Sequence, residues 1–577
     1  MFVTLGTQAE RCSALRFLIK LYHYRSHAFL DLVVLLRFNV AMILPQDGVW
    51  RWAAVFVAVC TVAAFELKGA VIIAGPEESG LRAAIAAAQP GDTVHMVNSV
   101  FLSNSVRIDK AITLYTEPSQ NYRIFLHGDV DTELLQIGAD GVVLEGLRLD
   151  GYYSRSDGVL AEKPLLLRDC IIENCRKPVR DAFWQTGASL RLERVTIIGN
   201  QEGLSVSRVE AKDSVFSYNQ LDGITGYYVV LDGCRLENNA INGAQFGNGR
   251  VRNCVFRYNG YYGLRCDPDL GVLSVSSSVF YANIRGGLFL GEKLTATIDN
   301  CTITRHTGGA AIEISQVHRA LFRHCTIADN VTISEPGSWP PAPEGAFVTG
   351  NYSVELQNCI VADNPTNGSP HASGLVGEWI DGGGNIIGGP ARLGVLQHNG
   401  GPTHTLMPLP DSPAINAGRP SDVMVDARGL SRIAGPAPDA GAIEVGAEPP
   451  ADTDTDGLPD LWERLYGLNP TSATDASLDS DGDGHNALTE FNFRTDPRNP
   501  QSVLRIRRGD FTWPYDPGLQ IIWSRVHGVE YQVETSTDLR TWRKVPRPYS
   551  PTFEGHSLNI VVPAGAGTLF YRVTVVP

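Results

Sequence analysis

The middle of the chain is built on a repeat of about 20 to 24 residues, and this repeat restricts the possible folds more than any other feature. Each copy has a small residue, a large apolar residue two places later and, in most copies, an asparagine five places later. Apolar residues alternate with others around these positions, which is the pattern of strands with one buried face. A repeat this short leaves no room for a helix, so it predicts stacked coils of short strands joined by turns.

Three columns of residues define the predicted interior of the coils. Successive small residues lie mostly 18 to 26 places apart, with a last interval of 34: Cys170, Thr196, Ser214, Cys234, Cys254, Ser278, Cys301, Cys325 and Cys359. The large apolar column is Ile172, Ile198, Phe216, Leu236, Phe256, Phe280, Ile303, Ile327 and Val361. The asparagine column is Asn219, Asn239, Asn259, Asn283, Asn330 and Asn364, with Cys175, Gln201 and His306 as exceptions.

Stacking explains why these columns hold the residues they do. Each residue should lie about 4.8 Å above its copy in the next coil. Asparagine amides can then hydrogen-bond along the column, and asparagine tolerates a left-handed turn conformation. We expect the column cysteines to be buried free thiols, because they are small and strand geometry need not suit a disulfide.

Composition agrees with a turn-rich β protein and excludes some classes of function. Glycine makes up 58 of 577 residues, and only 19% of residues are charged, against about 25% in an ordinary soluble domain. These values argue against a helical bundle. The net charge of -14 argues against a nucleic-acid-binding protein, which normally has a basic surface. Residues 448–496 hold twelve acids and two bases, so this one segment accounts for -10 of that charge.

The repeat resembles the right-handed parallel β-helix of the pectate-lyase-like superfamily over roughly residues 76–390. Residues 81–94 are similar to the capping helix and first strand of that family. Helix formers dominate Leu81 to Ala88, and Pro90 with Gly91 stops the helix. The resemblance implies an all-β, right-handed parallel β-helix with an N-terminal capping helix, which we assign to residues 65–390.

Residues 1–64 indicate export. Ala53 to Phe65 is apolar apart from Thr61, follows Arg51, and contains small residues around Ala64 that suit cleavage. The run is shorter than the roughly 18 apolar residues of a confident membrane span, so we expect no stable span in the mature chain. An uncleaved signal anchor is the alternative, and Met42 is the expected true start. Either way, we expect the protein to be secreted or held at the cell surface.

Residues 391–446 contain four motifs that follow the predicted solenoid, namely 393–405, 411–418, 426–429 and 439–444. In this order they resemble the choice-of-anchor Q domain of secreted bacterial β-helix proteins. The resemblance implies a cap close to the end of a β-helix and implies no chemistry. We interpret its polar cluster as turn residues of a packed cap rather than as a metal site: His398, Asn399, His404 and Asp411.

Residues 447–502 contain two twelve-residue acidic loops, 452–463 and 479–490. Calcium takes six to eight oxygen ligands, and this spacing of acids around a central glycine supplies them. The predicted calcium ligands are Asp452, Asp454, Asp456, Leu458, Asp460, Glu463, Asp479, Asp481, Asp483, His485 and Glu490. The loops resemble thrombospondin type 3 and dockerin-like repeats, in which calcium orders a linker, so the expected role of Ca²⁺ is structural. A solvated acidic linker without calcium is the alternative.

Residues 503–577 return to alternation, with predicted strands at 519–524, 531–534 and 569–575. They resemble the small fibronectin-like β-sandwich that ends many exported bacterial proteins. We interpret Trp523, Tyr531, Trp542 and Tyr571 as core aromatics, with a sugar-stacking platform as the alternative.

Candidate catalytic residues lie on the outward positions of the second strand of each coil. The predicted outward column is Ser205, Thr225, Gln245, Arg265, Phe289 and Glu313. Its acid and base candidates, with the acids that follow Arg265, are Arg265, Asp267, Asp269 and Glu313. An arginine beside carboxylates suits either proton abstraction next to a uronate carboxylate or glycoside hydrolysis. Solvated surface charges are the alternative interpretation.

The residues alone leave open whether the chain is an enzyme. The superfamily that it resembles includes polysaccharide lyases, hydrolases, epimerases and adhesins, and no catalytic motif of these matches residue by residue. We expect an exported protein that binds or processes polysaccharide at or outside the cell surface, with an acidic polysaccharide or a cell-surface glycan as partner. The alternatives are a non-catalytic adhesin and an architectural envelope protein. The oligomeric state stays open.

Overall fold

The computed structural model describes residues 69–500 and the strands between 506 and 575. Within 69–500 it leaves out 121, 127–131, 152–155, 183–189, 269–270, 332–345, 350–352, 366–371, 449–450, 494, 496 and 499. The predicted export signal at 1–64 lies outside the described residues.

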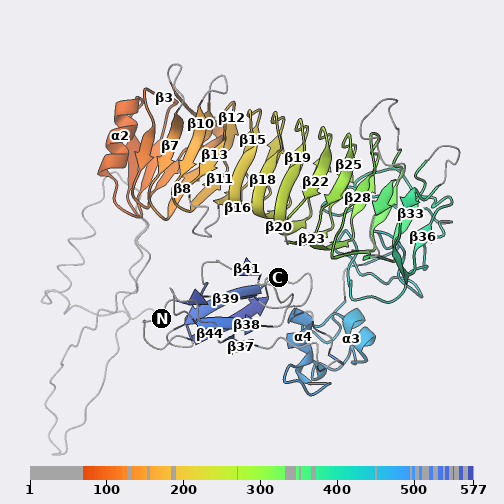
Figure 1. Cartoon of the computed structure of the whole chain (residues 1–577). Helices are drawn as coiled ribbons and strands as arrows, with labels where there is room; N and C mark the ends of the chain where they lie inside the picture. Colours follow the sequence, from red (N-terminus) through yellow and green to blue (C-terminus); the bar gives the residue numbers. More distant parts are fainter. Residues whose placement is uncertain are drawn as a thin grey trace, which may run out of the picture. The chain divides into compact units, whose positions relative to one another are not determined.

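Residues 71–387 form a parallel β-solenoid, as the repeat predicts (Figure 1). Among the described residues its two sheets have 13 and 23 strands. The 13-stranded sheet contains β3 (Val100–Leu102), β6 (Arg123–Leu126), β9 (Arg148–Asp150), β12 (Ile171–Glu173), β15 (Thr196–Ile198), β17 (Val215–Ser217), β19 (Arg235–Glu237), β21 (Val255–Arg257), β24 (Val279–Tyr281), β27 (Thr302–Thr304), β30 (Thr326–Ala328), β33 (Ile360–Ala362) and β36 (Ile386–Ile387).

The 23-stranded sheet consists of two series of strands that merge at three long strands. Its members are β1 (Val71–Ala74), β2 (Thr93–Met96), β4 (Val106–Ile108), β5 (Thr113–Tyr115), β7 (Glu133–Ile137), β8 (Val142–Glu145), β10 (Asp157–Ala161), β11 (Leu165–Arg168), β13 (Val179–Asp181), β14 (Leu190–Glu193), β16 (Leu204–Lys212), β18 (Ile224–Asp232), β20 (Ala244–Arg252), β22 (Tyr262–Cys266), β23 (Gly271–Ser276), β25 (Gly286–Leu290), β26 (Leu294–Asp299), β28 (Ile312–Ile314), β29 (Arg319–Arg323), β31 (Phe347–Thr349), β32 (Val354–Gln357), β34 (Leu375–Val376) and β35 (Ile380–Gly383). The nine-residue strands β16, β18 and β20 belong to both series.

The asparagine column forms a hydrogen-bonded ladder in the interior, as predicted. The Asn219 amide donates to Asn239 Oδ1 at 2.9 Å, Asn239 to Asn259 at 3.0 Å, and Asn259 to Asn283 at 2.8 Å. Each amide also donates to a backbone carbonyl, as Asn239 does to Phe216. Because these side chains are buried, satisfied hydrogen bonds are what makes the polar column tolerable in an apolar core.

The sequence alignment of the repeat was wrong by one residue at a single coil. Strand β15 pairs Thr196 with Ile171 and with Val215, so Val195 rather than Thr196 takes the place equivalent to Cys170. The ladder member of that coil is therefore Asn200 and not Gln201, and its amide donates to Asn219 Oδ1 at 3.1 Å. The apparent exception in the asparagine column disappears once this shift is made.

The left-handed turn conformation also lies one place earlier than we predicted. The residues just before the ladder have φ near +55°, including Tyr218, Asn238 and Tyr258, whereas the ladder asparagines do not. The asparagines contribute through their side-chain hydrogen bonds and not through a left-handed backbone conformation. The left-handed positions are occupied by several residue types, which is why no single type marks them in the sequence.

The column cysteines are free and buried, as expected. All eight described cysteines lack a disulfide, and the Cys254 thiol donates to the Arg252 carbonyl at 3.1 Å. Burial raises the pKa of the Cys170 thiol to about 12. These thiols therefore pack as small apolar groups.

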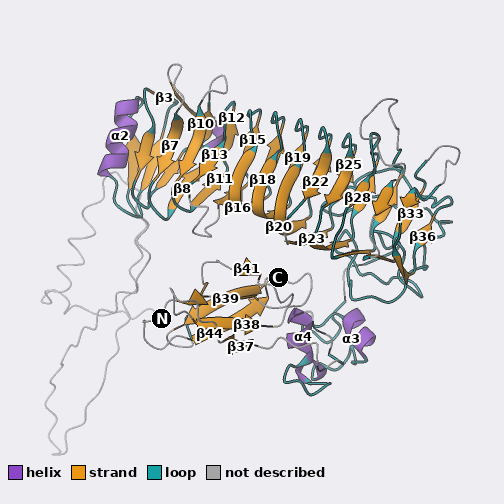
Figure 2. Ribbon diagram, viewed as in Figure 1, coloured by secondary structure: helices purple, strands orange, loops and turns teal. Residues whose placement is uncertain are grey.

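Helix α2 (Glu78–Ala87) packs against β1, β2 and β3 through Leu81, Ala84 and Ile85. Figure 1 shows it at one end of the solenoid. Lys110 Nζ donates to the Ala86 and Ala88 carbonyls at 2.6 and 2.7 Å, which satisfies acceptors that the end of a helix leaves open. Figure 2 shows how few helices accompany the strands. Besides α2, the described residues contain η2 (Pro118–Gln120), α3 (Asp460–Tyr466), η3 (Asp475–Ser477) and α4 (Ala487–Phe493).

Residues 391–446 pack against the outer face of the 13-stranded sheet near its last strands. Thr403 Oγ1 donates to the Ser277 carbonyl at 3.2 Å, Asn300 Nδ2 to the Val425 carbonyl at 2.9 Å, and the Ala442 amide to Thr326 Oγ1 at 2.9 Å. These contacts reach from the turn before β24 to strand β30. Ile360 and Ala362 face outward from β33. They form an apolar cluster with three alanines of this segment, namely Ala391, Ala414 and Ala440.

The acidic motifs of residues 391–446 hold this segment together. Asp426, Asp439 and Glu444 are buried, and each carboxylate accepts backbone amides. Glu444 accepts those of Ala434 and Asp439, at 2.9 and 2.8 Å. These acids replace the regular ladders that the segment lacks, because strands here are reduced to isolated bridges.

The described C-terminal strands are antiparallel and form two three-stranded sheets and a two-stranded one. The strands are β37 (Ile506–Gly509), β38 (Leu519–Trp523), β39 (Tyr531–Ser536), β40 (Arg543–Lys544), β41 (Ser550–Pro551), β42 (Leu558–Asn559), β43 (Val561–Val562) and β44 (Phe570–Val575). Strands β38, β39 and β44 match the three that the sequence predicts. Among the described residues, no helix is both long and apolar enough to cross a membrane.

His306 takes an asparagine position in the ladder and should make the solenoid sensitive to acid. Its amide donates to Asn330 Oδ1, and burial lowers the pKa of its ring to about 4. An unfolded histidine titrates near 6.5, so the stability that the neutral ring permits is present above that pH and is lost as pH falls towards 4. We expect the free energy of unfolding to drop by about 2 kcal/mol more in the parent than in His306→Asn between pH 7 and pH 5.

The measurement is urea unfolding of both proteins at the two pH values, followed by circular dichroism. His318→Asn is the matched control, because His318 is exposed on the same solenoid. Equal losses in the parent and in His306→Asn would show that the buried ring does not titrate in this range.

Candidate functional site

Arg265, Phe289 and Glu313 lie on consecutive strands of the 23-stranded sheet. Strand register pairs Arg265 of β22 with Phe289 of β25, and Phe289 with Glu313 of β28 (Figure 1). The same column continues in the other direction through Gln245, Thr225 and Ser205. The outward column expected from the repeat is therefore in register over six coils.

Arg265 is held against its neighbours on the surface. Its guanidinium carbon lies 4.3 Å from the centroid of the Phe289 ring, and Nη2 donates to Asp267 Oδ2 at 2.7 Å. About a third of each of the two charged side chains is exposed. An ion pair this exposed contributes little to stability, so a ligand can displace it at low cost. The third predicted member, Asp269, lies outside the described residues.

Glu313 belongs to a second group of interacting side chains, which the repeat spacing did not predict. The Tyr262 hydroxyl donates to the Glu313 carboxylate and accepts a hydrogen bond from Arg285 Nε at 2.9 Å. Arg285 Nη2 also lies 4.0 Å from Glu313 Oε2. Tyr262 is only 2% exposed, and burial followed by Glu313 raises the pKa of its hydroxyl well above the usual range. The tyrosine therefore stays protonated and fixes the carboxylate.

Glycine at 286 permits this group to form. Tyr262 pairs with Gly286 in the next coil, and its hydroxyl reaches Glu313 one coil further on. A Cβ at Gly286 would lie 3.2 Å from the Tyr262 ring and 2.2 Å from the Ala310 carbonyl oxygen. The predicted outward column, which aligns Arg265 with Phe289, implies this pairing, but the direction of the tyrosine side chain cannot be read from spacing.

An apolar surface strip leads up to Arg285. Backbone hydrogen bonds stack Leu221, Ile241, Tyr261 and Arg285 on successive coils. Tyr261 is 49% exposed, and the Arg285 guanidinium carbon lies 5.8 Å from its ring centroid. We call Tyr261, Tyr262, Arg265, Arg285, Phe289 and Glu313 the arginine–aromatic cluster. It presents two cations, a fixed carboxylate and an exposed ring, which suit a ligand with both apolar faces and acidic or hydroxyl groups.

The acidic loops form two further carboxylate clusters. In the first, one carboxylate oxygen from each of Asp454, Asp456, Glu463 and Asp475 lies within 4.8 Å of the others. Glu463 is 0% exposed, and neither of its oxygens has a hydrogen-bond partner among the residues that the structure describes. Burial, then Asp454 and Asp456, raises the pKa of Glu463 to about 7. Buried oxygens without partners are rare in folded proteins, and these four carboxylates are a ligand set that suits a cation.

The second cluster is more open. Oxygens of Asp479, Asp481 and Asp483 lie within 4.8 Å of one another. Glu490 is fully buried, accepts from Thr495 Oγ1 at 3.2 Å, and has a second oxygen without a partner in the described structure. The amides of Gly484 and Gly457 donate to the first aspartate of their loops, Asp479 and Asp452. The two loops thus fold alike, and an all-oxygen ligand set fits Ca²⁺.

Two acids in and near the first loop make contacts that the spacing did not predict, while the ligand prediction for Asp460 stays a prediction. Asp460, predicted as a ligand, accepts the Thr453 amide and hydroxyl, both at 2.7 Å, and so closes the loop on itself. Asp475, which lies outside both twelve-residue patterns, joins the cluster instead. Only the fold brings it there, since eleven residues lie between it and Glu463.

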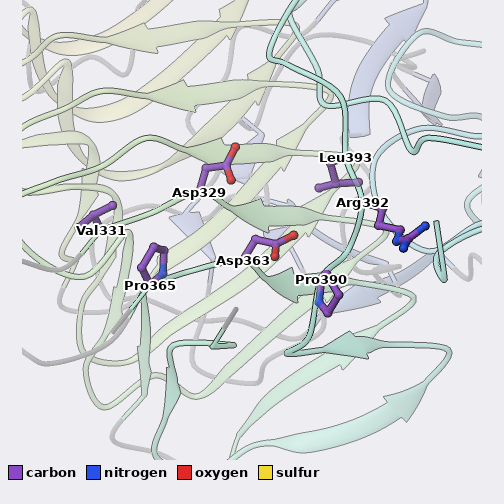
Figure 3. Close-up of a pocket in the computed structure, with 7 residues that line it drawn as sticks. All are labelled: Asp329, Val331, Asp363, Pro365, Pro390, Arg392 and Leu393. Atoms are coloured by element: carbon purple, nitrogen blue, oxygen red, sulfur yellow. The ribbon is translucent and has the colours of Figure 1, made fainter. Parts of the chain in front are cut away.

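A hollow of 480 Å³ lies where residues 390–393 meet the solenoid (Figure 3). Asp329 and Asp363, from neighbouring coils, line it with Val331, Pro365, Pro390, Arg392 and Leu393. The pKa of Asp329 is raised, first by desolvation and then by Asp363. The Ala391 amide donates to Asp363 Oδ2 at 2.8 Å. Paired acids make this hollow a poor site for an acidic ligand.

Known proteins give limited further information. A search of curated proteins finds no match. Among solved structures, pectate lyase Pel9A is 12% identical, with 65% of this chain and 96% of that chain covered and a TM-score of 0.35. The Dettilon tailspike protein is 10% identical, covering 54% and 69%, with a TM-score of 0.39. The A-module of Azotobacter vinelandii mannuronan C-5 epimerase AlgE4 is 15% identical, covering 56% and 96%, with a TM-score of 0.34. Values this low transfer no residue role to this chain.

Residues 224–385 match a family model described as the right handed beta helix region. The match includes β18 to β35 and therefore the whole arginine–aromatic cluster. It agrees with the parallel strand pairing and with the fold expected from the repeat. The chain is thus a parallel β-solenoid whose residues 224–385 are similar to the right-handed β-helix region.

Proposed function

We propose that this chain binds an acidic polysaccharide on the outward face of its solenoid, at the arginine–aromatic cluster. The observation that carries the proposal is the placement of two arginines over aromatic rings on adjacent coils, Arg265 over Phe289 and Arg285 over the exposed Tyr261. Guanidinium groups form bidentate hydrogen bonds with carboxylates, and aromatic faces pack against sugar rings. A linear polymer lying along the solenoid axis would meet these groups in succession.

The same cluster holds the groups that processing of the polymer would require. Glu313 is an acid or base held by the Tyr262 hydroxyl, and Arg285 supports both. Proton transfer at a substrate needs such a positioned group within hydrogen-bond reach. A non-catalytic adhesin is the second candidate, because both arginines are already paired with carboxylates, Arg265 with Asp267 beside the cluster and Arg285 with Glu313 within it.

The remaining modules are proposed to serve export and stability. The N-terminal segment directs the chain out of the cell, helix α2 covers the first coil, and residues 503–577 form a terminal β-sandwich. The two acidic loops bind Ca²⁺ as a structural ion. The support for calcium is the set of buried carboxylate oxygens without partners in both loops. When bound, Ca²⁺ neutralises these carboxylates, and the chain's own part is to hold them in place.

Removing Arg285 or the exposed ring of Tyr261 should weaken binding of acidic polysaccharides. A hydrogen bond to a charged group contributes about 1.5–3 kcal/mol, so Arg285→Gln should raise the Kd at least tenfold. Tyr261→Ala should weaken binding through loss of ring packing. The measurement is calorimetric titration with a panel of uronate-containing and neutral polysaccharides.

Tyr227→Ala is the matched control, since Tyr227 is 62% exposed on β18 and lies outside the cluster. Unchanged affinity in Arg285→Gln and Tyr261→Ala would move the binding site elsewhere. In the same panel, new unsaturated products or reducing ends that disappear in Glu313→Gln would establish processing. Binding without either product would favour the adhesin.

Chelation of calcium should loosen the acidic loops without unfolding the solenoid. Without a cation, the carboxylates of each cluster repel one another and buried oxygens lose their counter-charge. We expect EDTA to open residues 452–490 to a protease, with cleavage sites read by mass spectrometry, while added Ca²⁺ restores resistance. Magnesium is the control ion, because it demands a tighter octahedral site. Identical cleavage with EDTA and with Ca²⁺ would contradict a structural ion.

A further inference from the structure

We propose that Asp475 is a calcium ligand of the first loop and that it makes the two loops unequal, so that the first binds Ca²⁺ more tightly and helps to order the second. This inference rests on the calcium role proposed above. It adds a ligand that lies outside both loop patterns, and it adds an order of binding.

The position of Asp475 carries the first part. Asp475 is 5% exposed, and its Oδ2 accepts the Asn469 amide at 2.7 Å. Its Oδ1 is buried and has no hydrogen-bond partner within the described structure. One oxygen of this carboxylate lies within 4.8 Å of oxygens from Asp454, Asp456 and Glu463. A second buried acid aimed at the same point as Glu463 is best explained by a shared cation.

The difference between the loops follows from charge and from rigidity. The first cluster gathers four carboxylates, two of them buried in the protein. The second gathers three, all at least partly exposed, and its buried Glu490 is not within the same 4.8 Å group. Calcium affinity rises with the number of charged ligands and with the rigidity of the site. The first loop should therefore fill at a lower calcium concentration.

Asp475 also connects the two loops through the backbone. It begins η3, and the Leu478 amide donates to its carbonyl at 2.9 Å. The Ala487 amide in turn donates to the Leu478 carbonyl at 2.8 Å, at the first residue of α4. Leu478 directly precedes Asp479, the first acid of the second loop. A cation that fixes Asp475 consequently fixes the start of the second loop and, through Leu478, its ninth residue, Ala487.

The apolar core of the module supports this connection. Leu458 of the first loop, Trp462 of α3, Ala476 of η3 and Ala487 of α4 form one buried cluster. Ala476 is the neighbour of Asp475, so ordering of the acid and packing of the core happen together. Coupling between two sites is reciprocal, but the first site fills while the second is still empty. Loss of the first site should therefore weaken the second, whereas loss of the second leaves the first binding step unchanged.

The variant Asp475→Asn tests the inference with little disturbance. Asparagine keeps a side-chain oxygen that can accept the Asn469 amide, and it removes the charge. Asp481→Asn removes a ligand of the second loop only. Glu448→Gln is the control, because Glu448 is an exposed acid just ahead of the first loop.

The experiment is calorimetric titration of the full chain and each variant with Ca²⁺ in metal-free buffer. Tb³⁺ luminescence excited through Trp462, which directly precedes Glu463, gives a second readout of ion binding in the module. We expect two classes of site in the parent. Asp475→Asn should weaken the tighter class at least tenfold, lower the terbium signal and also weaken the second class. Asp481→Asn should leave the tighter class intact, and Glu448→Gln should change neither.

The outcomes separate this inference from the calcium role itself. If the parent binds Ca²⁺ but Asp475→Asn titrates like the parent, Asp475 is only the acceptor of the Asn469 amide and the inference fails. Weakening of the first class alone overturns the coupling. If the parent binds no Ca²⁺ at millimolar concentration, the proposed calcium role fails as well.

Discussion

The hydrogen bonding between parallel coils is the interaction on which the rest of this structure depends. Along the described solenoid, strands pair in parallel with those of the neighbouring coils, and the register shifts only between β32 and β35. Register then determines everything that lies on the surface, because a shift by one residue would exchange the inward and outward faces. The asparagine ladder secures that register from the inside, since each amide must meet its copy one coil away. The arginine–aromatic cluster exists only because three coils keep the same alignment.

The periodic parts of this protein could be predicted from the sequence, because a repeat indicates which residues take the same position in successive coils. The interior columns, the free cysteines and the outward positions of Arg265, Phe289 and Glu313 all follow from equivalence. The error at Thr196 arose because the coil there contains Val195 in place of a small residue, so the small-residue criterion selected its neighbour. Equivalent backbone positions can be assigned from the repeat only where a coil has the usual residue types. The assignment fails at a coil that does not.

Side-chain direction and contacts between distant segments could not be predicted in this way. Tyr262 forms a hydrogen bond with Glu313, two coils away. Its side chain can take this direction because Gly286 has no Cβ that would crowd the tyrosine ring. Asp475 enters the first acidic cluster from outside the loop pattern, and Asp460 accepts hydrogen bonds from Thr453. A spacing pattern describes the ligands that one loop offers, whereas the cluster is assembled by the fold around the loop. Both functional regions therefore hold residues that only the three-dimensional structure adds.

The position of residues 391–446 changes how the solenoid can lose its structure. A stack in which each coil touches only its neighbours can unravel from an end, one coil at a time. Here one segment bonds to Ser277, Asn300 and Thr326, which belong to different coils, and it is itself tied by buried acids. These crosslinks make the later coils a single cooperative block. Mechanical or thermal loss of order should then begin in the earlier coils, while the coils from β24 to β30 keep their structure as one unit.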